Sequence, residues 1–241
     1  IVGGLLGLLL LIIRMKSLES GMFDEMREEG IKRGDLKLIF GNRQNFKKYV
    51  QCIMVGIPIW FVIGLLIMNS KDDFGPMLGL KNINNGYAVM YAYIGLSAGD
   101  LAAGLLSQWL KSRRKVVMLF LLMTLVVTAA FLFGSNQISE QWYYFYCFLL
   151  GASTGYWAIF VTIAAEQFGT NIRSTAANTV PNFVRGSVFI IVSLFTLFSA
   201  YLNTGMAALM VGIIALVCAF WGVYNLKETF SKDLNYHEEF I

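Results

Sequence analysis

Residues 116–134 read VVMLFLLMTLVVTAAFLFG and contain no charged side chain. The polar groups in this segment are the hydroxyls of Thr124 and Thr128, and each can hydrogen-bond a carbonyl oxygen of its own helix. A helix needs about 20 largely apolar residues to cross the hydrocarbon core of a bilayer. The segment therefore predicts a membrane-spanning helix suited to face lipid.

The composition of the whole chain also favours a membrane protein. Hydrophobic residues make up 57% of the 241 residues and charged residues 14%, whereas a soluble domain carries about 25% charged residues. The net charge of +4 is small, and no block of basic residues is mixed with aromatic ones, so nucleic-acid binding is not expected. The expected fold class is an all-α membrane protein, with the lipid bilayer as its surroundings.

Five further segments are apolar and long enough to cross a membrane. With residues 116–134 they give six expected spans: 47–68, 85–110, 116–134, 142–165, 181–202 and 207–226. Of the 19 Lys and Arg residues, 17 lie in the stretches 14–48, 111–115, 166–186 and 227–241. Only Lys71 and Lys81 lie in the loops between them. The positive-inside rule then places the four basic stretches, and the C-terminus, in the cytoplasm.

The N-terminal segment differs from the six spans. Residues 1–13 are apolar but too short to cross a bilayer, and Arg14 and Lys16 follow them. A signal peptide carries its basic residues before the apolar run, so we expect the end of a membrane helix that begins outside the chain. The predicted organisation is a truncated helix in 1–13, a cytoplasmic linker with an amphipathic helix in 14–46, a six-helix bundle in 47–226 and a cytoplasmic tail in 227–241.

The polarity of the six spans repeats after three helices. In each half an aromatic-rich span is followed by a more polar one and then by a plain apolar one, such as 116–134 or 207–226. Such a repeat is typical of transporters built from inverted repeats. The bundle is therefore expected to consist of two inverted three-helix repeats.

Asp100 is the one acidic residue well inside a predicted span. Ten residues separate it from Leu110, which corresponds to roughly 15 Å of helix and places it near the middle of the bilayer. An unpaired charge there costs at least ~2.5 kcal/mol, so the carboxyl should be paired, hydrated or protonated. Two interpretations stay open: a coupling site for a proton, or a structural partner for a cation or a helix terminus. Arg185, at the predicted cytoplasmic start of its span, is expected to lie too shallow to pair with it.

The spacing Gly95-x-x-x-Gly99 on the same span predicts a close helix contact, because glycines let two backbones approach. Shortly after it comes GLLSQWLKSRRK, residues 104–115, which resembles the loop signature of the major facilitator superfamily. Gly104, Leu106 and Ser107 match that signature, and Arg113 and Arg114 match it loosely. Gln108, Trp109 and Lys111 replace the Asp, Arg and Gly of the usual form, as in the weaker copy that follows the eighth helix of the family.

A second segment, AEQFGTNIRSTA at residues 165–176, resembles the cytoplasmic segment after the tenth helix of the same family. The matching residues are Glu166, Phe168, Gly169, Thr170, Arg173, Ser174 and Thr175. The resemblance implies that Glu166 and Arg173 pair across the loop or with neighbouring loops and latch one conformation. A static surface pair, worth about 0–1 kcal/mol, is the alternative. The sequence LKET at residues 226–229 is similar to the family's P-E-T-K end without its proline.

The resemblance covers the chain from Lys47 onward and implies the C-terminal half of a twelve-helix secondary transporter. Such a protein moves a small solute by alternating access, and the missing N-terminal six-helix half would be the partner of this bundle. A proton is the candidate coupling ion, and the plasma membrane or a bacterial inner membrane is the expected location. The solute-binding candidates are Trp60, Tyr93, Ser97, Asp100, Thr154, Tyr156 and Trp157. The latch candidates are Gly104, Ser107, Arg113, Arg114, Glu166 and Arg173.

Other classes of protein are less well supported. A seven-helix receptor or photoreceptor is the alternative if residues 1–13 are counted as a span, but the last span has no lysine to carry a retinal. The only histidine, His237, lies in the polar tail, and the three cysteines have no paired spacing. We therefore expect no metal site, no cofactor and no enzymatic activity.

Overall fold

The computed structural model describes residues 2–15, 34–134, 138–231, 236 and 238, and every regular element among them is a helix. The helices are α1 (Val2–Met15), α3 (Lys37–Phe40), α4 (Arg43–Trp60), η1 (Phe61–Ile67), η2 (Ser70–Phe74), α5 (Gly75–Met77), α6 (Asn85–Leu110), α7 (Arg113–Phe133), α8 (Glu140–Ser153), α9 (Trp157–Glu166), α10 (Thr170–Ser199) and α11 (Thr204–Asn225). η1 and η2 are π-helices, and η1 continues α4 with wider turns.

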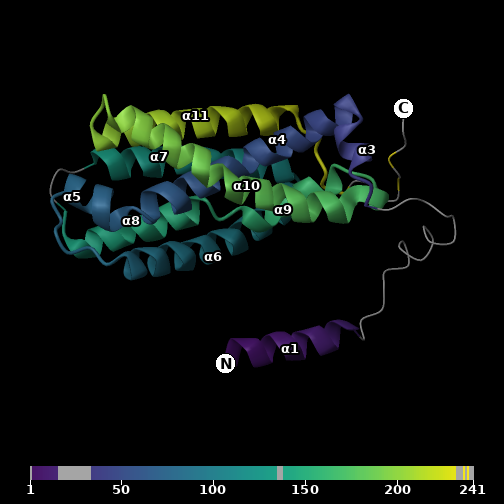
Figure 1. Cartoon of the computed structure of the whole chain (residues 1–241), viewed down its shortest axis with the longest axis horizontal. Helices are drawn as coiled ribbons and strands as arrows, with labels where there is room; N and C mark the ends of the chain where they lie inside the picture. The colour runs from purple at the N-terminus through teal and green to yellow at the C-terminus, as the bar shows by residue number, and fades with distance from the viewer. Residues whose placement is uncertain (1, 16–33, 135–137, 232–235, 237, 239–241) are drawn as a thin grey trace.

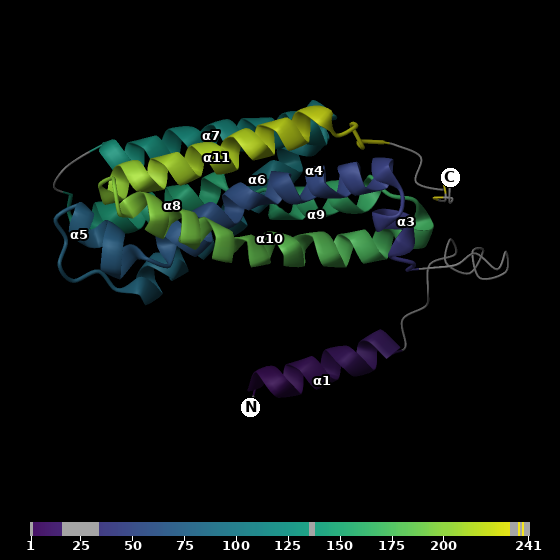
Figure 2. The ribbon, with the colours of Figure 1, turned by 45° about the horizontal axis from the view of Figure 1, so that its top comes forward.

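Six segments of the described chain are long and apolar enough to cross a membrane, which confirms the six predicted spans. They are α4 with η1, α6, α7, α8 with α9, α10, and α11. Figures 1 and 2 show them side by side along the long axis of one bundle, with α7 next to α11 and α6 next to α8. α1 lies apart from the bundle in both views. The amphipathic helix predicted in 14–46 falls largely on residues 16–33, which lie outside the described residues.

The end of the bundle where α4 begins and α11 ends is called the basic end below. α6, α9 and α11 finish there, and α7 and α10 start there after short turns. Ser112 caps α7 by accepting a hydrogen bond from the Lys115 N–H at 3.2 Å, which satisfies one of the free donors of the first turn.

The fifth span begins earlier than predicted. Pro181 was expected to start it, but α10 begins at Thr170 and runs through Pro181 to Ser199. A proline is tolerated inside a membrane helix because neighbouring groups can satisfy the carbonyl that it leaves unpaired. Arg185 therefore lies 15 residues into α10, about 22 Å from its start. The prediction that Arg185 lies at a shallow position was wrong, because this residue is half-way along the bundle.

The fourth span is broken in its middle. α8 ends at Ser153 and α9 begins at Trp157, so residues 154–156 interrupt the helix that the sequence predicted as continuous. The break lies against α6, where a Cβ on Gly155 would overlap the backbone of Gly99. Only glycine permits this approach, because any side chain would push the two backbones apart.

Glycines also bring α6 and α8 together before the break. A Cβ on Gly95 would overlap the carbonyl oxygen of Phe148, and one on Gly151 would overlap the carbonyl oxygen of Ala92. The close helix contact predicted from Gly95-x-x-x-Gly99 is therefore confirmed, and α8 is its partner.

The spans differ in how much of them is buried. In the most apolar part of each span, 22% of the residues of α6 and 28% of those of α10 are buried, against at least 44% in the other four. α6 and α10 are thus the exposed helices of the bundle, although they carry more polar side chains than α7 and α11.

Candidate functional site

A cavity of about 210 Å³ lies half-way along the bundle. Its lining comes from α4, η1, α6, α9 and α10 and consists of Ile59, Trp60, Ile63, Tyr93, Leu96, Trp157 and Arg185. Three of the predicted solute-binding residues, Trp60, Tyr93 and Trp157, are thus brought together. Hollows of about 540, 540 and 350 Å³ are lined without any charged side chain. A hollow of about 360 Å³ is lined by charged side chains, but it lies at the basic end, around Lys48, Lys227 and Glu238. The 210 Å³ cavity is therefore the one that combines a mid-bundle position with a charged side chain.

Arg185 supplies the charge of this cavity. Its guanidinium carbon lies 5.2 Å from the centroid of the Trp157 ring, within the range of a cation–π contact. Its Nη1 donates a hydrogen bond of 2.9 Å to Oδ1 of Asn182, one turn earlier on α10. Within the described residues, the two ion pairs are Lys48–Glu238 and Arg113–Glu166, so Arg185 has no carboxylate partner.

The sequence contained a signal for Arg185 that was missed. Residues 170–180 carry a single charge, Arg173, and they can extend the apolar helix backwards past Pro181. A boundary at the proline places the arginine at the cytoplasmic start of the span, whereas the helix in the structure begins 11 residues earlier, at Thr170.

Trp60 brings an unsatisfied donor to the cavity wall. Its indole Nε1 is buried and has no hydrogen-bond partner among the residues that the structure describes. Trp60 is the last residue of α4 before the π-helical turns of η1, and Ile63 lies within those turns. π-helical turns in an α-helix often occur at functional sites. Tyr93, on the facing helix α6, is 45% exposed.

Asp100 caps the second half of the broken span. Its Oδ1 accepts a hydrogen bond of 3.0 Å from the N–H of Ala158, the second residue of α9. That N–H has no partner within its own helix, and a carboxylate is also favoured at the positive end of the helix dipole. The structure thus realises the interpretation in which Asp100 is the partner of a helix terminus. Asp100 and Arg185 contact neighbouring residues of α9, Ala158 and Trp157 respectively.

The other predicted solute-binding residues do not line the cavity. The Ser97 hydroxyl donates to a carbonyl oxygen of its own helix at 2.9 Å. Thr154 is fully buried and bonds two carbonyl oxygens of α8. The Tyr156 hydroxyl donates to the carbonyl oxygen of Val55 at 3.0 Å and is buried in the core. Thr154 and Tyr156 therefore hold the chain at the helix break.

The latch candidates meet only in part. An oxygen of Glu166, at the end of α9, lies 2.8 Å from Nη2 of Arg113, at the start of α7. Glu166 thus pairs with the first residue of α7, next to the loop between α6 and α7, and not with Arg173. Gly104 and Ser107 are residues of α6, and a Cβ on Gly104 would meet nothing within 4 Å.

A second contact at the basic end joins α7 to α11. The carboxylate of Glu228 accepts hydrogen bonds from the Ser112 hydroxyl and from the N–H groups of Arg113 and Arg114, the latter two at 3.0 and 3.3 Å. In return, the guanidinium of Arg114 donates to the carbonyl oxygens at the end of α11, at 3.1 Å for Val223. Glu228, which follows α11, thus caps the start of α7, and Arg114 of α7 caps the end of α11.

The acidity of Glu228 follows from this arrangement. Burial opposes ionisation, but the hydrogen bonds from Ser112, Phe230, Arg113 and Thr229 outweigh it and hold the pKa of Glu228 below its ordinary value. The sequence LKET at 226–229 is similar only to the P-E-T-K end of the family, and this similarity did not predict that its glutamate would cap α7.

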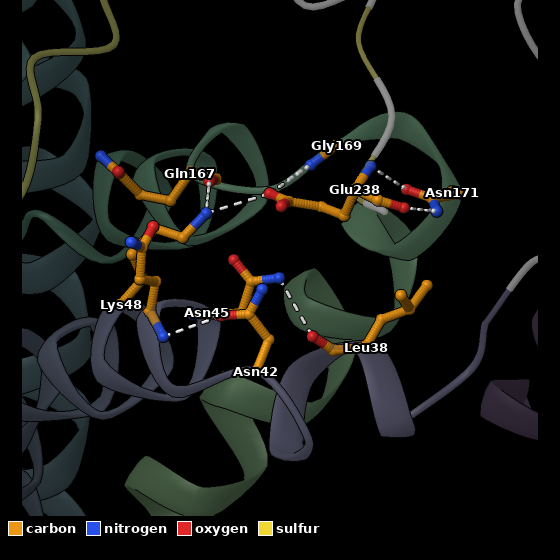
Figure 3. Close-up of polar contacts among 9 residues, drawn as sticks. Leu38, Asn42, Asn45, Lys48, Gln167, Gly169, Asn171 and Glu238 are labelled. Carbon is orange, nitrogen blue, oxygen red and sulfur yellow. Dashed lines mark hydrogen bonds and ion pairs between the residues drawn. The ribbon is translucent and has the colours of Figure 1, made fainter. Parts of the chain in front are cut away.

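The C-terminal tail makes a third contact, which Figure 3 shows. Glu238 pairs with Lys48 Nζ of α4 at 3.0 Å and accepts a hydrogen bond of 3.3 Å from the N–H of Gly169. Its backbone exchanges two hydrogen bonds with the Asn171 side chain, at 2.9 and 3.0 Å. The tail thereby ties the start of α4 to the start of α10.

In comparisons with known proteins, no protein-family model, curated protein or solved structure matches this chain. The class of the site therefore follows from its geometry. It is a cavity half-way along an apolar helical bundle, next to a helix break, with an aromatic wall and one arginine. Such a site can hold a small molecule away from both membrane surfaces, as binding sites of transporters do.

Proposed function

We propose that this chain is the C-terminal half of a secondary active transporter that resembles the major facilitator superfamily. In this proposal two inverted three-helix repeats, α4–α7 and α8–α11, form one half of a twelve-helix protein that moves a small solute by alternating access. The observation that carries the proposal is the mid-bundle cavity beside the break between α8 and α9. Transporter sites typically lie at the bilayer midplane, where helices are discontinuous.

The exposure of α6 and α10 supports the proposal that a second half of the protein packs against this bundle. α6 and α10 are the least buried spans, yet they expose polar side chains such as Ser97, Asn182 and Arg185. Polar groups facing lipid are costly, so they normally face protein or a water-filled cavity. A second six-helix bundle packed over α6 and α10 would cover these groups and complete the cavity.

The basic end supports a proposed orientation of the bundle in the membrane and a proposed contact that switches between access states. By the positive-inside rule this end lies in the cytoplasm, together with the C-terminal tail. The Arg113–Glu166 pair and the Glu228 cap lie where the cytoplasmic loops of two halves would meet. In the proposed mechanism these contacts stabilise one access state, and a proton is the candidate coupling ion through Asp100.

The proposal is tested on the full-length protein that contains this chain. One pair of spin labels joins Lys115, at the basic end, to a position on the other half of the protein. A second pair joins Asp72, at the opposite end of the bundle, to another position on the other half. Alternating access predicts two distance populations at each end that change in opposite directions. A single unchanging distance at both ends under all solute and pH conditions refutes it.

A further inference from the structure

The mid-bundle cavity is rich in hydrogen-bond donors and poor in acceptors. Arg185 has five guanidinium N–H donors, of which Nη1 bonds Asn182. Trp60 adds a buried indole N–H without a partner in the described part of the chain. No carboxylate lines the cavity. The one acid of the neighbouring helix, Asp100, is bonded to the α9 backbone.

The arginine is also held in place for a ligand. Its contact with the Trp157 ring at 5.2 Å and its bond to Asn182 fix two sides of the guanidinium. Arg185 is exposed half-way along α10, where a charge facing lipid is costly without a counter-ion, and none of the described residues supplies one. A bound anion would provide that counter-ion.

The rest of the lining favours an anion whose uncharged part is apolar. Ile59, Ile63 and Leu96 are aliphatic, and the rings of Trp60, Trp157 and Tyr93 complete the wall. The volume of about 210 Å³ corresponds to roughly seven water molecules at ~30 Å³ each. This volume is the part of the cavity that this half contributes, and its lining fits a solute with one charged group and an apolar remainder.

We propose that this cavity binds a small organic monocarboxylate, with its carboxylate on Arg185 and its apolar body against the aromatic wall. A planar carboxylate matches the fork of N–H donors on an arginine, and a single cation balances a single negative charge. This inference names the solute class of the proposed transporter and so rests on the proposed function for its biological meaning. Binding itself can be measured independently of transport.

The experiment is a calorimetric titration of the purified full-length protein in detergent. The probes are butyrate and benzoate, their neutral counterparts butyramide and benzamide, and the cation tetramethylammonium. We expect saturable binding of a carboxylate and at least tenfold weaker binding of its amide. Arg185→Gln should weaken carboxylate binding about 10- to 100-fold, as expected for loss of a hydrogen bond to a charged group, and Arg185→Lys less.

Arg43→Gln is the matched control, because it removes an exposed arginine at the start of α4, far from the cavity. It should leave carboxylate binding unchanged. Equal binding of amide and carboxylate, or no saturable carboxylate binding at millimolar concentration, overturns the inference. The comparison of amide with carboxylate uses the unaltered protein, so it decides the matter even if Arg185→Gln does not fold.

Uptake of radiolabelled benzoate into proteoliposomes separates the two proposals. Carboxylate binding that depends on Arg185, without uptake or exchange, contradicts the transport function but leaves the anion site intact. Uptake of a neutral solute that survives Arg185→Gln contradicts the anion site and leaves the transporter.

Discussion

At the scale of single residues, Asp100 joins two helices through one hydrogen bond. Its carboxylate caps α9 by accepting from the Ala158 N–H, and the amide oxygen of an asparagine can accept the same bond. Asp100→Asn should therefore leave the thermal unfolding midpoint nearly unchanged. Asp100→Ala should destabilise the full-length protein by about 0.5–2 kcal/mol, as loss of a helix cap does. Asp72→Ala, an exposed acid outside the spans, is the control.

The same residue separates structure from coupling. If Asp100 also carries the coupling proton, Asp100→Asn should abolish concentrative uptake in proteoliposomes while solute exchange continues. The reason is that the amide of asparagine cannot bind and release a proton as a carboxylate does. Parallel assays of uptake and counterflow check this. Full concentrative uptake by a normally expressed Asp100→Asn protein would leave Asp100 with the capping role alone.

At the scale of helices, the close backbone contact between α6 and the α8–α9 break can be tested with two glycine substitutions in α6. A Cβ on Gly99 would overlap the carbonyl oxygen of Ala152 and lie 2.8 Å from Gly155 Cα. Gly99→Ala should thus lower stability by about 1–3 kcal/mol, because backbone cannot move aside as a flexible side chain can. Gly104→Ala, five residues later with open space around it, should be neutral or stabilising. Thermal unfolding of both variants is the measurement, and equal effects would contradict the close contact.

The helices also show what the sequence could predict. Apolar length and alternating charge were sufficient for six spans, because the cost of polar groups in lipid acts on every segment independently of its neighbours. The start of α10 and the break before Trp157 depend on tertiary contacts that a single segment does not reveal. Pro181 does not end its helix, and the break follows from the approach of Gly99 and Gly155. For this reason Trp60, Tyr93 and Trp157 line the mid-bundle cavity together, whereas Thr154 and Tyr156 are buried at the helix break. Arg185, which was predicted from the sequence to lie near the basic end, also lines the cavity.

At the scale of the whole molecule, the basic end holds the bundle together through charge. The pKa of Glu228 is lower in the fold than the ordinary glutamate value, which is about 4.3. Its carboxylate therefore stabilises the fold above that ordinary value, and this stabilisation is lost as pH falls from there through the lower pKa of the folded protein. The unfolding midpoint should decline over this acid range more steeply in the unaltered protein than in Glu228→Gln. Melting curves between pH 3 and 7 measure this, and parallel slopes would contradict the cap.

The ion pair between Arg113 and Glu166 gives the last prediction, which concerns the balance between access states. The two side chains are partly shielded from solvent, with 19% and 10% of their surfaces exposed, so their attraction is less screened than that of a surface pair. If the pair stabilises the state in which the cytoplasmic loops are closed, Glu166→Gln and Arg113→Gln should each shift the population by about 1–2 kcal/mol. The double variant should add little, because either change alone breaks the same contact.

Spin-label distances across the cytoplasmic mouth of the full-length protein measure the shift. Lys48→Gln is the control, since it breaks an ion pair at the same end that ties the tail to α4. Distance distributions that stay the same in both single variants would make the pair a static contact within the bundle.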